Sequence, residues 1–393
     1  MAPWLPLAER RGSDWPMGTG SNSPTVHVLQ DAVIMPGSRG LHGLNGQPIL
    51  ESYLQRGPLD RPDYYGGLPE PMEPLAKGCQ NQQWDNCLFI PYARLDHFGH
   101  LLTETTAWLW PCLGTTNNPL HWADSSMPVV LADHAEDGCA SIAALLGLPA
   151  NQVLSTASLT RPVVSRRVFL PMPSMVNRRW IAHHHINAVR EIVGRVAGLS
   201  ATDLARCRAA ALDPTSPLRI YLSRGRLGPE CRRLEGESVL EQHLARCGWL
   251  ILHPQELTIL DQLRLLARAR VVAGEAGSAF HLLMVYGQDM APKTIAMLGV
   301  RGLSRDPRMI NFSEQLRQQP VDFHYLMCLG FKRRSPSPTA AHQQPIQGID
   351  DRRFLVSPQR VANRLVAIAN AGPRATTAGH QPGGRDELAN SWR

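Results

Sequence analysis

Several patterns that assign a chain to a common protein class are missing from this sequence. The eight cysteines are scattered and none forms a C-x-x-C pair, so neither a zinc site nor a thioredoxin-like motif is indicated. No window approaches the ~18 uninterrupted apolar residues that a membrane-spanning helix needs. The first residues lack the apolar region of a signal peptide. These absences predict a cytoplasmic protein whose cysteines are reduced.

The charge balance favours anionic ligands. Lys and Arg number 40 against 33 Asp and Glu, a net charge of +7, and most of the positive charge is arginine. This excess also suits loose, peripheral contact with an anionic membrane surface. The sequence contains no dense basic tract with interleaved aromatic residues, so nucleic acid is not expected as a partner.

Changes in composition and hydrophobic pattern along the sequence predict two α/β domains and several connecting segments. Residues 1–25 are rich in Pro, Gly and Ser and predict a disordered leader. Residues 26–85 mix short apolar runs with Pro and Gly, which is typical of β-hairpins and loops. The expected divisions after the leader are an N-terminal α/β domain at 26–198, a linker at 199–217, a C-terminal α/β domain at 218–330, a loop at 331–348, a C-terminal helix at 349–372 and a disordered tail at 373–393.

Short apolar strands alternate with helical patterns from residue 86 onward, which predicts parallel sheets. Two such units predict a pair of Rossmann-like domains with the ligand in the cleft between them. The expected strands are Cys87–Pro91, Pro128–Asp133, Gln152–Ser155, Val163–Leu170, Arg219–Leu222, Leu250–His253, Val271–Ala273 and Thr294–Leu298. The expected helices are Phe98–Trp110, Gly138–Leu146, Val176–Ala197, Glu237–Cys247, Ile259–Ala269, one beginning at Ser278, and Pro358–Ala371.

Two segments near the middle of the chain indicate a phosphate site. Arginines follow the strand Ile220–Leu222, and about 40 residues later another strand runs into a glycine turn, Gly274 to Ser278, where a helix begins. Guanidinium groups pair in a fork with phosphate oxygens, and a glycine turn at a helix start offers backbone N–H groups to the same anion. The pattern favours a phosphorylated ligand such as a nucleotide-sugar. Solvated turn arginines and a glycine turn that only permits tight packing remain alternatives.

His100 and Glu104 lie four residues apart and therefore share one face of the predicted helix. Either residue can serve as a general base, and such a pair can orient one another. A His–Glu pair that merely ties the helix to a neighbour remains open, and His97 is a further candidate. The three adjacent histidines at 183–185 point about 100° apart on a helix, so they cannot chelate a metal together.

Four blocks of sequence, in order, resemble glycosyltransferase family 61. They are His97–Glu104, the strand followed by Ser223-Arg224 and Arg232-Arg233-Leu234, Gly248-Trp249 with Pro254, and Leu257–Gln262 with Val271–Ser278. The resemblance covers roughly residues 85–330. It implies a GT-B fold and an inverting transfer of sugar from a nucleotide donor, and bacterial relatives are associated with capsule, exopolysaccharide or lipopolysaccharide assembly.

The resemblance also implies roles for individual residues. A glycan or lipid-linked acceptor would lie near His100 and Glu104, and arginines facing the leaving diphosphate would replace a metal, since the sequence has no Asp-x-Asp pattern. No cofactor other than the nucleotide-sugar is therefore expected. The expected donor-binding residues, for a UDP-linked sugar, are Ser223, Arg224, Arg232, Gly274, Glu275, Gly277, Ser278 and His281.

Three positions depart from the family pattern. Ala276 stands where the family usually has His, and Leu282 stands in place of an Asn that usually follows. The Asn-Glu after the arginines becomes Gly236-Glu237. A non-catalytic carbohydrate- or nucleotide-binding protein on the same scaffold is therefore the alternative, and another nucleotide-sugar enzyme such as an epimerase is a third reading.

Overall fold

In the computed structural model the chain folds into two compact units, Met1–Leu199 and Ser200–Arg393. The residues that the structure describes are 25–56, 63–65, 67–75, 82–113, 127–132, 136–177, 180–228, 234–300, 311–312, 315–316, 319–332, 352–355 and 357–373.

The first unit is built on a seven-stranded sheet in the order β3-β2-β1-β9-β6-β7-β8. Its strands are β1 (Val26–Ile34), β2 (Leu41–His42), β3 (Pro48–Ile49), β6 (Gln82–Ile90), β7 (Val129–Leu131), β8 (Val153–Ser155) and β9 (Val163–Pro171). Strands β9, β6, β7 and β8 run parallel, as the alternation of strands and helices predicts. Strand β1 is antiparallel to β9, so the sheet is mixed. Two small hairpins accompany it, β4 (Gln55–Arg56) with β5 (Asp63–Tyr64), and β10 (Met175–Val176) with β11 (Trp180–Ile181).

A continuous helical segment from Phe98 to Cys112 confirms the helix expected at Phe98–Trp110. It consists of α1 (Phe98–His100), a π-helical turn η2 (Leu101–Thr105), α2 (Thr106–Leu109) and a 3-10 turn η3 (Trp110–Cys112). In the π turn the Thr106 N–H bonds to the carbonyl of Leu101, five residues earlier. Such turns insert an extra residue into a helix and are frequent at functional sites.

Two longer helices complete the first unit, α3 (Glu136–Leu146) and α4 (His183–Ala197). The helix expected at Val176–Ala197 begins only at His183, because the residues before it form the β10–β11 hairpin. Short 3-10 turns lie at η1 (Leu50–Ser52), η4 (Ala150–Gln152) and η5 (Thr156–Ser158).

The second unit also has a seven-stranded sheet, in the order β13-β18-β17-β16-β15-β12-β14. Its strands are β12 (Arg219–Leu222), β13 (Leu234–Glu235), β14 (Leu250–Leu252), β15 (Val271–Glu275), β16 (Lys293–Val300), β17 (Val321–Lys332) and β18 (Arg352–Leu355). The five neighbours from β14 to β17 are all parallel. Counted along the chain, their order is 2-1-3-4-5, so the winding of the chain reverses between β12 and β15. In open α/β sheets the carboxyl ends of the strands at this reversal are the usual place for a ligand.

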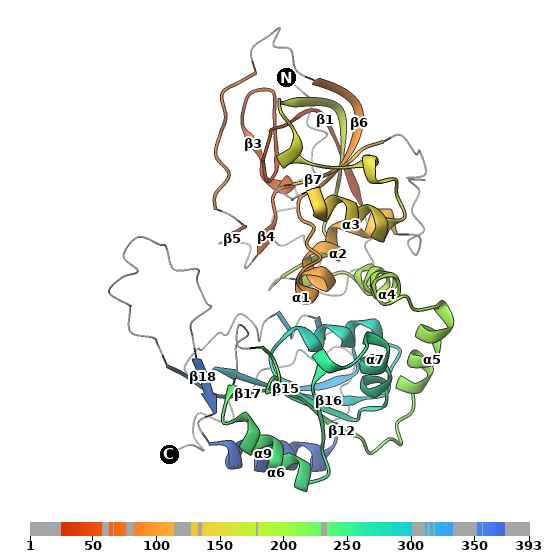
Figure 1. Ribbon diagram of the computed structural model, residues 1–393, viewed down its shortest axis with the longest axis vertical. Coiled ribbons are helices and arrows are strands. Elements are labelled where there is room, and N and C mark those ends of the chain that lie inside the picture. The colour runs from red at the N-terminus through yellow and green to blue at the C-terminus, as the bar shows by residue number, and fades with distance from the viewer. Residues whose placement is uncertain are drawn as a thin grey trace. The chain divides into compact units, whose positions relative to one another are not determined.

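Helices cover both faces of this sheet. Figure 1 shows α6 (Glu237–Arg246) and α9 (Pro358–Ala371) side by side on one face, and α7 (Ile259–Arg268) on the other. Tyr221 of β12 packs with Leu240 of α6 and Leu365 of α9 in the core between the sheet and these two helices. Helix α5 (Ala201–Ala211), within the segment 199–217, packs on α7. The turn after β14 is η6 (Pro254–Glu256), and the helix expected at Ser278 is a 3-10 helix, η7 (Ser278–Val285).

Strand β17 is longer than its parallel neighbour β16. The residues of β17 that extend past the end of β16 determine where β18 lies. The last pair between β16 and β17 is Val300 with Leu329, and β18 pairs antiparallel with residues 329–332 along the other edge of β17. At Gly330 a Cβ atom would lie 2.3 Å from the Phe354 ring, so only glycine leaves room for this side chain. Strand β18 is therefore attached to the extension of β17 at the carboxyl end of the parallel strands. Sequence patterns predicted neither β17 nor β18.

None of the helices in the described ranges is both long and apolar enough to cross a membrane.

Candidate functional site

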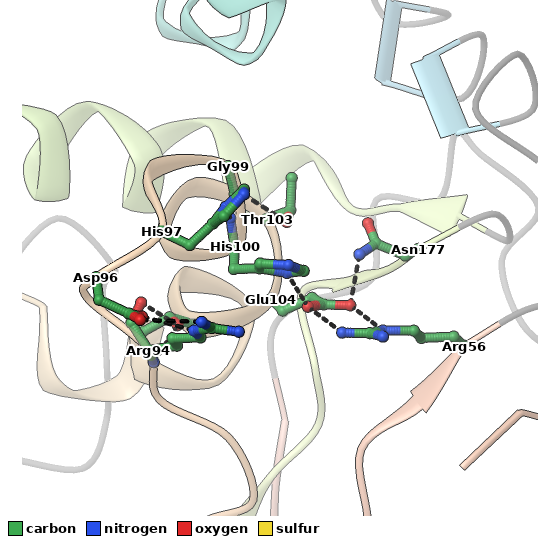
Figure 2. A network of polar contacts seen from close by, with 10 residues as sticks. Arg56, Arg94, Asp96, His97, Gly99, His100, Thr103, Glu104 and Asn177 are labelled. Carbon is green, nitrogen blue, oxygen red and sulfur yellow. Dashed lines mark hydrogen bonds and ion pairs between the residues drawn. The ribbon is translucent and has the colours of Figure 1, made fainter. Parts of the chain in front are cut away.

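The expected pair His100 and Glu104 is in direct contact in the first unit. His100 Nδ1 lies 2.6 Å from Glu104 Oε2, and Figure 2 shows the imidazole lying over the carboxylate. The Glu104 side chain is 3% exposed, whereas that of His100 is 30% exposed. The carboxylate is thus the inner member of the pair and the imidazole the outer one.

Glu104 is held by groups from three separate segments. Arg56, on β4, donates from Nε to Oε1 and from Nη2 to Oε2, the second at 2.7 Å. Asn177, just after β10, donates from Nδ2 to Oε1 at 2.6 Å. With His100 included, each carboxylate oxygen accepts two hydrogen bonds (Figure 2). A buried carboxylate needs such compensation, because leaving it unpaired is costly.

These contacts determine the protonation state of Glu104. Burial alone would raise the pKa of its carboxyl group, but hydrogen bonds from His100 and Arg56, and their charges, outweigh burial and lower that pKa to about 2. Glu104 is therefore an acceptor at neutral pH, and Nδ1 of His100 donates to it. A neutral imidazole held in this way has its lone pair on Nε2, which is the arrangement of a general base.

The neighbouring His97 lies at the N-terminal cap of α1. Its Nδ1 accepts the His100 backbone N–H at 3.3 Å, and the two rings are 4.4 Å apart. Burial lowers the pKa of His97, and the nearby His100 and Arg94 lower it further. His97 thus helps to fix the start of the helix that carries the pair.

A second cluster lies in the second unit where β12 and β15 end. Ser223 is buried, donates from Oγ to Glu241 at 2.5 Å and accepts the Gly225 N–H at 2.9 Å. The serine therefore shapes the turn after β12. A hollow of about 440 Å³ opens next to this turn, and its lining includes Arg226, Glu241, Ile251, His253 and Glu256.

Arg224 and Glu275, expected at one site, do lie together. Arg224 Nε is 3.5 Å from Glu275 Oε2, and the Glu275 side chain is 1% exposed. A second arginine, Arg353 of β18, donates from Nη1 to Glu275 Oε1. The carboxylate is thus enclosed by guanidinium groups that come from opposite ends of the second unit's sequence.

Glu237, at the start of α6, completes the setting of Arg224. Its carboxyl group accepts the Arg224 backbone N–H at 3.1 Å and the Tyr221 hydroxyl at 2.9 Å. Burial raises the pKa of Glu237 to about 7, although the two hydrogen bonds oppose this effect.

The two glycines of the turn have different surroundings. At Gly274 a Cβ atom would lie 2.7 Å from the Leu222 carbonyl oxygen, so this glycine permits the close approach of β15 to β12. At Gly277 it would lie 3.1 Å from Nη1 of Arg224, the far end of a flexible side chain. Ser278 is the first residue of η7. Gly274 thus serves packing, and Gly277 leaves room beside a charged group.

The remaining expected donor residues are His281 and Arg232. His281 is buried, with Nδ1 2.7 Å from Gln315 Oε1 and its ring stacked 4.9 Å from that of Phe312. Arg232 lies outside the described residues.

Within the described part of the chain, no three His, Cys, Asp or Glu side chains gather in a way that would hold a metal ion. His185, in the histidine run of α4, is buried, with Nδ1 2.7 Å from Ser174 Oγ and Nε2 3.1 Å from the Leu102 carbonyl.

The residues of the two clusters that were not foreseen include Arg56, Asn177, Glu237 and Arg353. Arg56, Asn177 and Arg353 lie far from their partners in sequence and in segments without a recognisable motif. Glu237 was noted only as part of a departure from a motif, and its burial depends on tertiary packing.

The Glycosyltransferase 61 family model matches residues 98–297, about half of the chain. The matched region contains His100, Glu104, Arg224 and Glu275 and leaves out Arg56 and Arg353. No curated protein matches the chain.

Proposed function

The chain belongs to glycosyltransferase family 61, and we propose that it transfers a sugar from a UDP-linked donor to a hydroxyl group of a glycan or lipid-linked acceptor. The proposal includes inversion at the anomeric carbon, a GT-B arrangement with one substrate held by each unit, and a role in bacterial polysaccharide assembly. The observation that carries it is the partly exposed imidazole of His100, oriented by the buried carboxylate of Glu104.

His100 is the proposed general base. Nε2 takes the proton of the acceptor hydroxyl while its oxygen attacks the anomeric carbon, and the bond from that carbon to the donor phosphate breaks. The nucleoside diphosphate leaves with the bonding electrons. Glu104 keeps the proton on Nδ1 before the reaction and stabilises the imidazolium that forms, so it acts as a positioning residue.

Arg224 and the glycine turn are the proposed donor site. Negative charge grows on the diphosphate as the bond breaks, and a fixed guanidinium and backbone N–H groups at the start of η7 are suited to stabilise it. The hollow lined by Arg226 and by Glu241, the hydrogen-bond partner of Ser223, has a volume in the range of small-molecule sites. It supports this assignment as a place for the nucleoside. Arg232 is proposed as a second diphosphate contact on the sequence pattern alone.

The base assignment is tested by measuring release of nucleoside diphosphate from a panel of nucleotide-sugars with glycan acceptors. Replacing the base, His100→Ala, should lower kcat by about a hundredfold or more and leave the donor Kd unchanged. His183→Ala, an exposed histidine on α4, is the matched control. Full activity of His100→Ala would exclude this residue as the base.

The donor site is tested separately by a thermal-shift screen of nucleoside diphosphates on the wild type and on Arg224→Ala. UDP should raise the Tm of the wild type and have little effect on the variant. If no nucleoside diphosphate shifts the wild type, the donor-site assignment fails.

A non-catalytic binding protein is the second candidate. The observation that favours it is the burial of Ala276 and Leu282, apolar side chains at positions where the family resemblance leads one to expect His and Asn. Binding on a glycan array without turnover of any nucleotide-sugar would support this alternative. Turnover of one donor would exclude it.

A further inference from the structure

We propose that Glu241 binds the ribose of the donor nucleotide, with its carboxylate accepting hydrogen bonds from the vicinal 2′ and 3′ hydroxyl groups. This inference rests on the proposed donor site and names the part of the donor that Glu241 recognises. It makes the protein selective for ribonucleotide donors over their deoxy analogues.

The turn that follows β12, residues 223–225, lies directly on the carboxylate of Glu241. Ser223 Oγ donates to Glu241 Oε1 at 2.5 Å and accepts the Gly225 N–H at 2.9 Å. A Cβ atom at Gly225 would lie 3.0 Å from the same carboxylate oxygen, so the glycine permits this close approach. Glu241 is thus next to both chain neighbours of Arg224, the proposed diphosphate ligand.

Glu241 also lines the hollow of about 440 Å³. The hollow lies at the end of β14, whose last residue, Leu252, accepts the Ser223 N–H at 2.7 Å. Strands β12 and β14 are adjacent and parallel, so the hollow and the β12 turn are neighbours at the carboxyl ends of the strands. These ends are where open α/β sheets bind nucleotides.

The order of groups along a nucleotide matches this arrangement. In a nucleoside diphosphate the ribose links the base to the diphosphate. A side chain that contacts the diphosphate turn and also lines the hollow is therefore placed at the ribose. The base then occupies the rest of the hollow, where Ile251 and Leu257 supply apolar surface.

The carboxylate has the chemistry that a ribose needs. An ionised carboxylate only accepts hydrogen bonds, and the hydroxyl groups of a ribose can each donate one. Hydrogen bonds to an ionised acceptor are shorter and stronger than those between neutral groups. Ser223 occupies Oε1 of Glu241, which leaves Oε2 for the ligand.

Two neighbouring glutamates are less suited to this role. Glu237, one helical turn earlier on α6, is 2% exposed and accepts the Arg224 backbone N–H. Glu256 lines the hollow but is ion-paired with Arg226 at 2.8 Å. Of the three, Glu241 is the one that both contacts the β12 turn and lines the hollow.

The experiment compares the binding of UDP with that of 2′,3′-dideoxy-UDP, which lacks both hydroxyl groups, by calorimetry on the full-length wild type and on Glu241→Ala. The wild type should bind UDP about tenfold or more tightly than the analogue, the scale of a hydrogen bond to a charged group. In Glu241→Ala this ratio should fall to within about threefold. Both ligands carry the same diphosphate, so any change in the β12 turn alters both Kd values alike and cancels in their ratio.

Three outcomes would overturn the inference. A wild type that binds UDP and the analogue equally has no contact with the ribose hydroxyl groups. If Glu241→Ala keeps the tenfold ratio, Glu241 only holds the β12 turn. A wild type that binds no nucleoside diphosphate overturns the donor site itself and this inference with it. The first two outcomes require UDP binding, so the failure of the inference and the failure of the donor site are distinguishable.

Matched variants separate the ribose contact from the turn and from folding. Ser223→Ala removes the hydrogen bond to the turn but keeps the carboxylate, so the ratio should stay at tenfold or more even if both Kd values rise. Glu256→Gln should also keep the ratio, and its loss there would move the ribose contact to Glu256. Circular dichroism establishes whether each variant folds. If Glu241→Ala does not fold, Glu241→Gln keeps the size with an uncharged, weaker acceptor and should lower the ratio about threefold or more.

Discussion

Glu104 lies beneath His100 with its Oε2 atom 2.6 Å from Nδ1, and three other hydrogen bonds from Arg56 and Asn177 hold the same carboxylate in place. The sequence left open which member of the pair is the base. The geometry supports His100, since Glu104 has each oxygen occupied twice and is almost fully buried.

Glu104→Gln should lower kcat by about a hundredfold or more while the UDP affinity stays the same. The amide keeps the size of the side chain but removes the negative charge that holds the proton on Nδ1 and stabilises the imidazolium. Steady-state kinetics and calorimetry check the two parts. A variant with wild-type kcat would show that the pair only fastens the helix to its neighbours.

The same carboxylate should make the protein sensitive to acid. The pKa of Glu104 is lowered to about 2 from 4.5. Its stabilising contribution is therefore complete above pH 4.5 and is lost as the pH falls through 2. The contribution is on the order of 3 kcal/mol. Urea unfolding between pH 3 and pH 7 should show a steeper acid loss in the wild type than in Glu104→Gln. Equal slopes would contradict the assignment.

Glu237 should have the opposite pH dependence. Its pKa is raised to about 7, so the folded protein binds a proton that the unfolded chain releases near pH 4.5. The free energy of unfolding should therefore fall as the pH rises from 4.5 through 7, by an amount on the order of 3 kcal/mol. Glu237→Gln should remove most of this decline. Glu256→Gln, an exposed glutamate of the same unit, is the control and should keep it.

The two turn glycines should respond differently to one added methyl group. Gly274→Ala would place Cβ against the Leu222 backbone and should cost about 1–3 kcal/mol of stability. The Cβ atom of Gly277→Ala comes close only to the end of the Arg224 side chain and makes an ordinary contact with the Glu275 carbonyl oxygen, so stability should change by less than about 0.5 kcal/mol. Its effect should instead be weaker UDP binding, because the guanidinium must move. Denaturation and calorimetry on both variants separate the two roles.

Much of the fold follows from local patterns, because the parallel strands and their helices are short, strongly apolar or amphipathic segments. The expected ranges for α3, α6, α7 and α9 agree with the structure to within about two residues. What the patterns missed depends on distant partners. Strand β1 pairs with β9, more than a hundred residues away, and β18 begins 20 residues after the end of β17.

The candidate site divides in the same way. His100 and Glu104 are predictable because a helix brings residues four apart onto one face, even where a π turn interrupts it. Arg56 and Asn177 are not, since they come from hairpins whose position is fixed by tertiary packing. The sequence also could not predict that Glu104 is the buried member of the pair, because burial is a property of the whole fold.

Cutting the chain to the region of the family match would remove β17 together with its extension. A protein cut at the limits of the family match, 98–297, would lose β1, β6, β17 and β18 and part of β16. Strands β7 and β9 and the rest of β16 would then present unpaired backbone groups beside apolar side chains. Exposed edges of this kind recruit strands from other molecules. Such a fragment should aggregate when produced alone, although it contains most of the residues of both clusters.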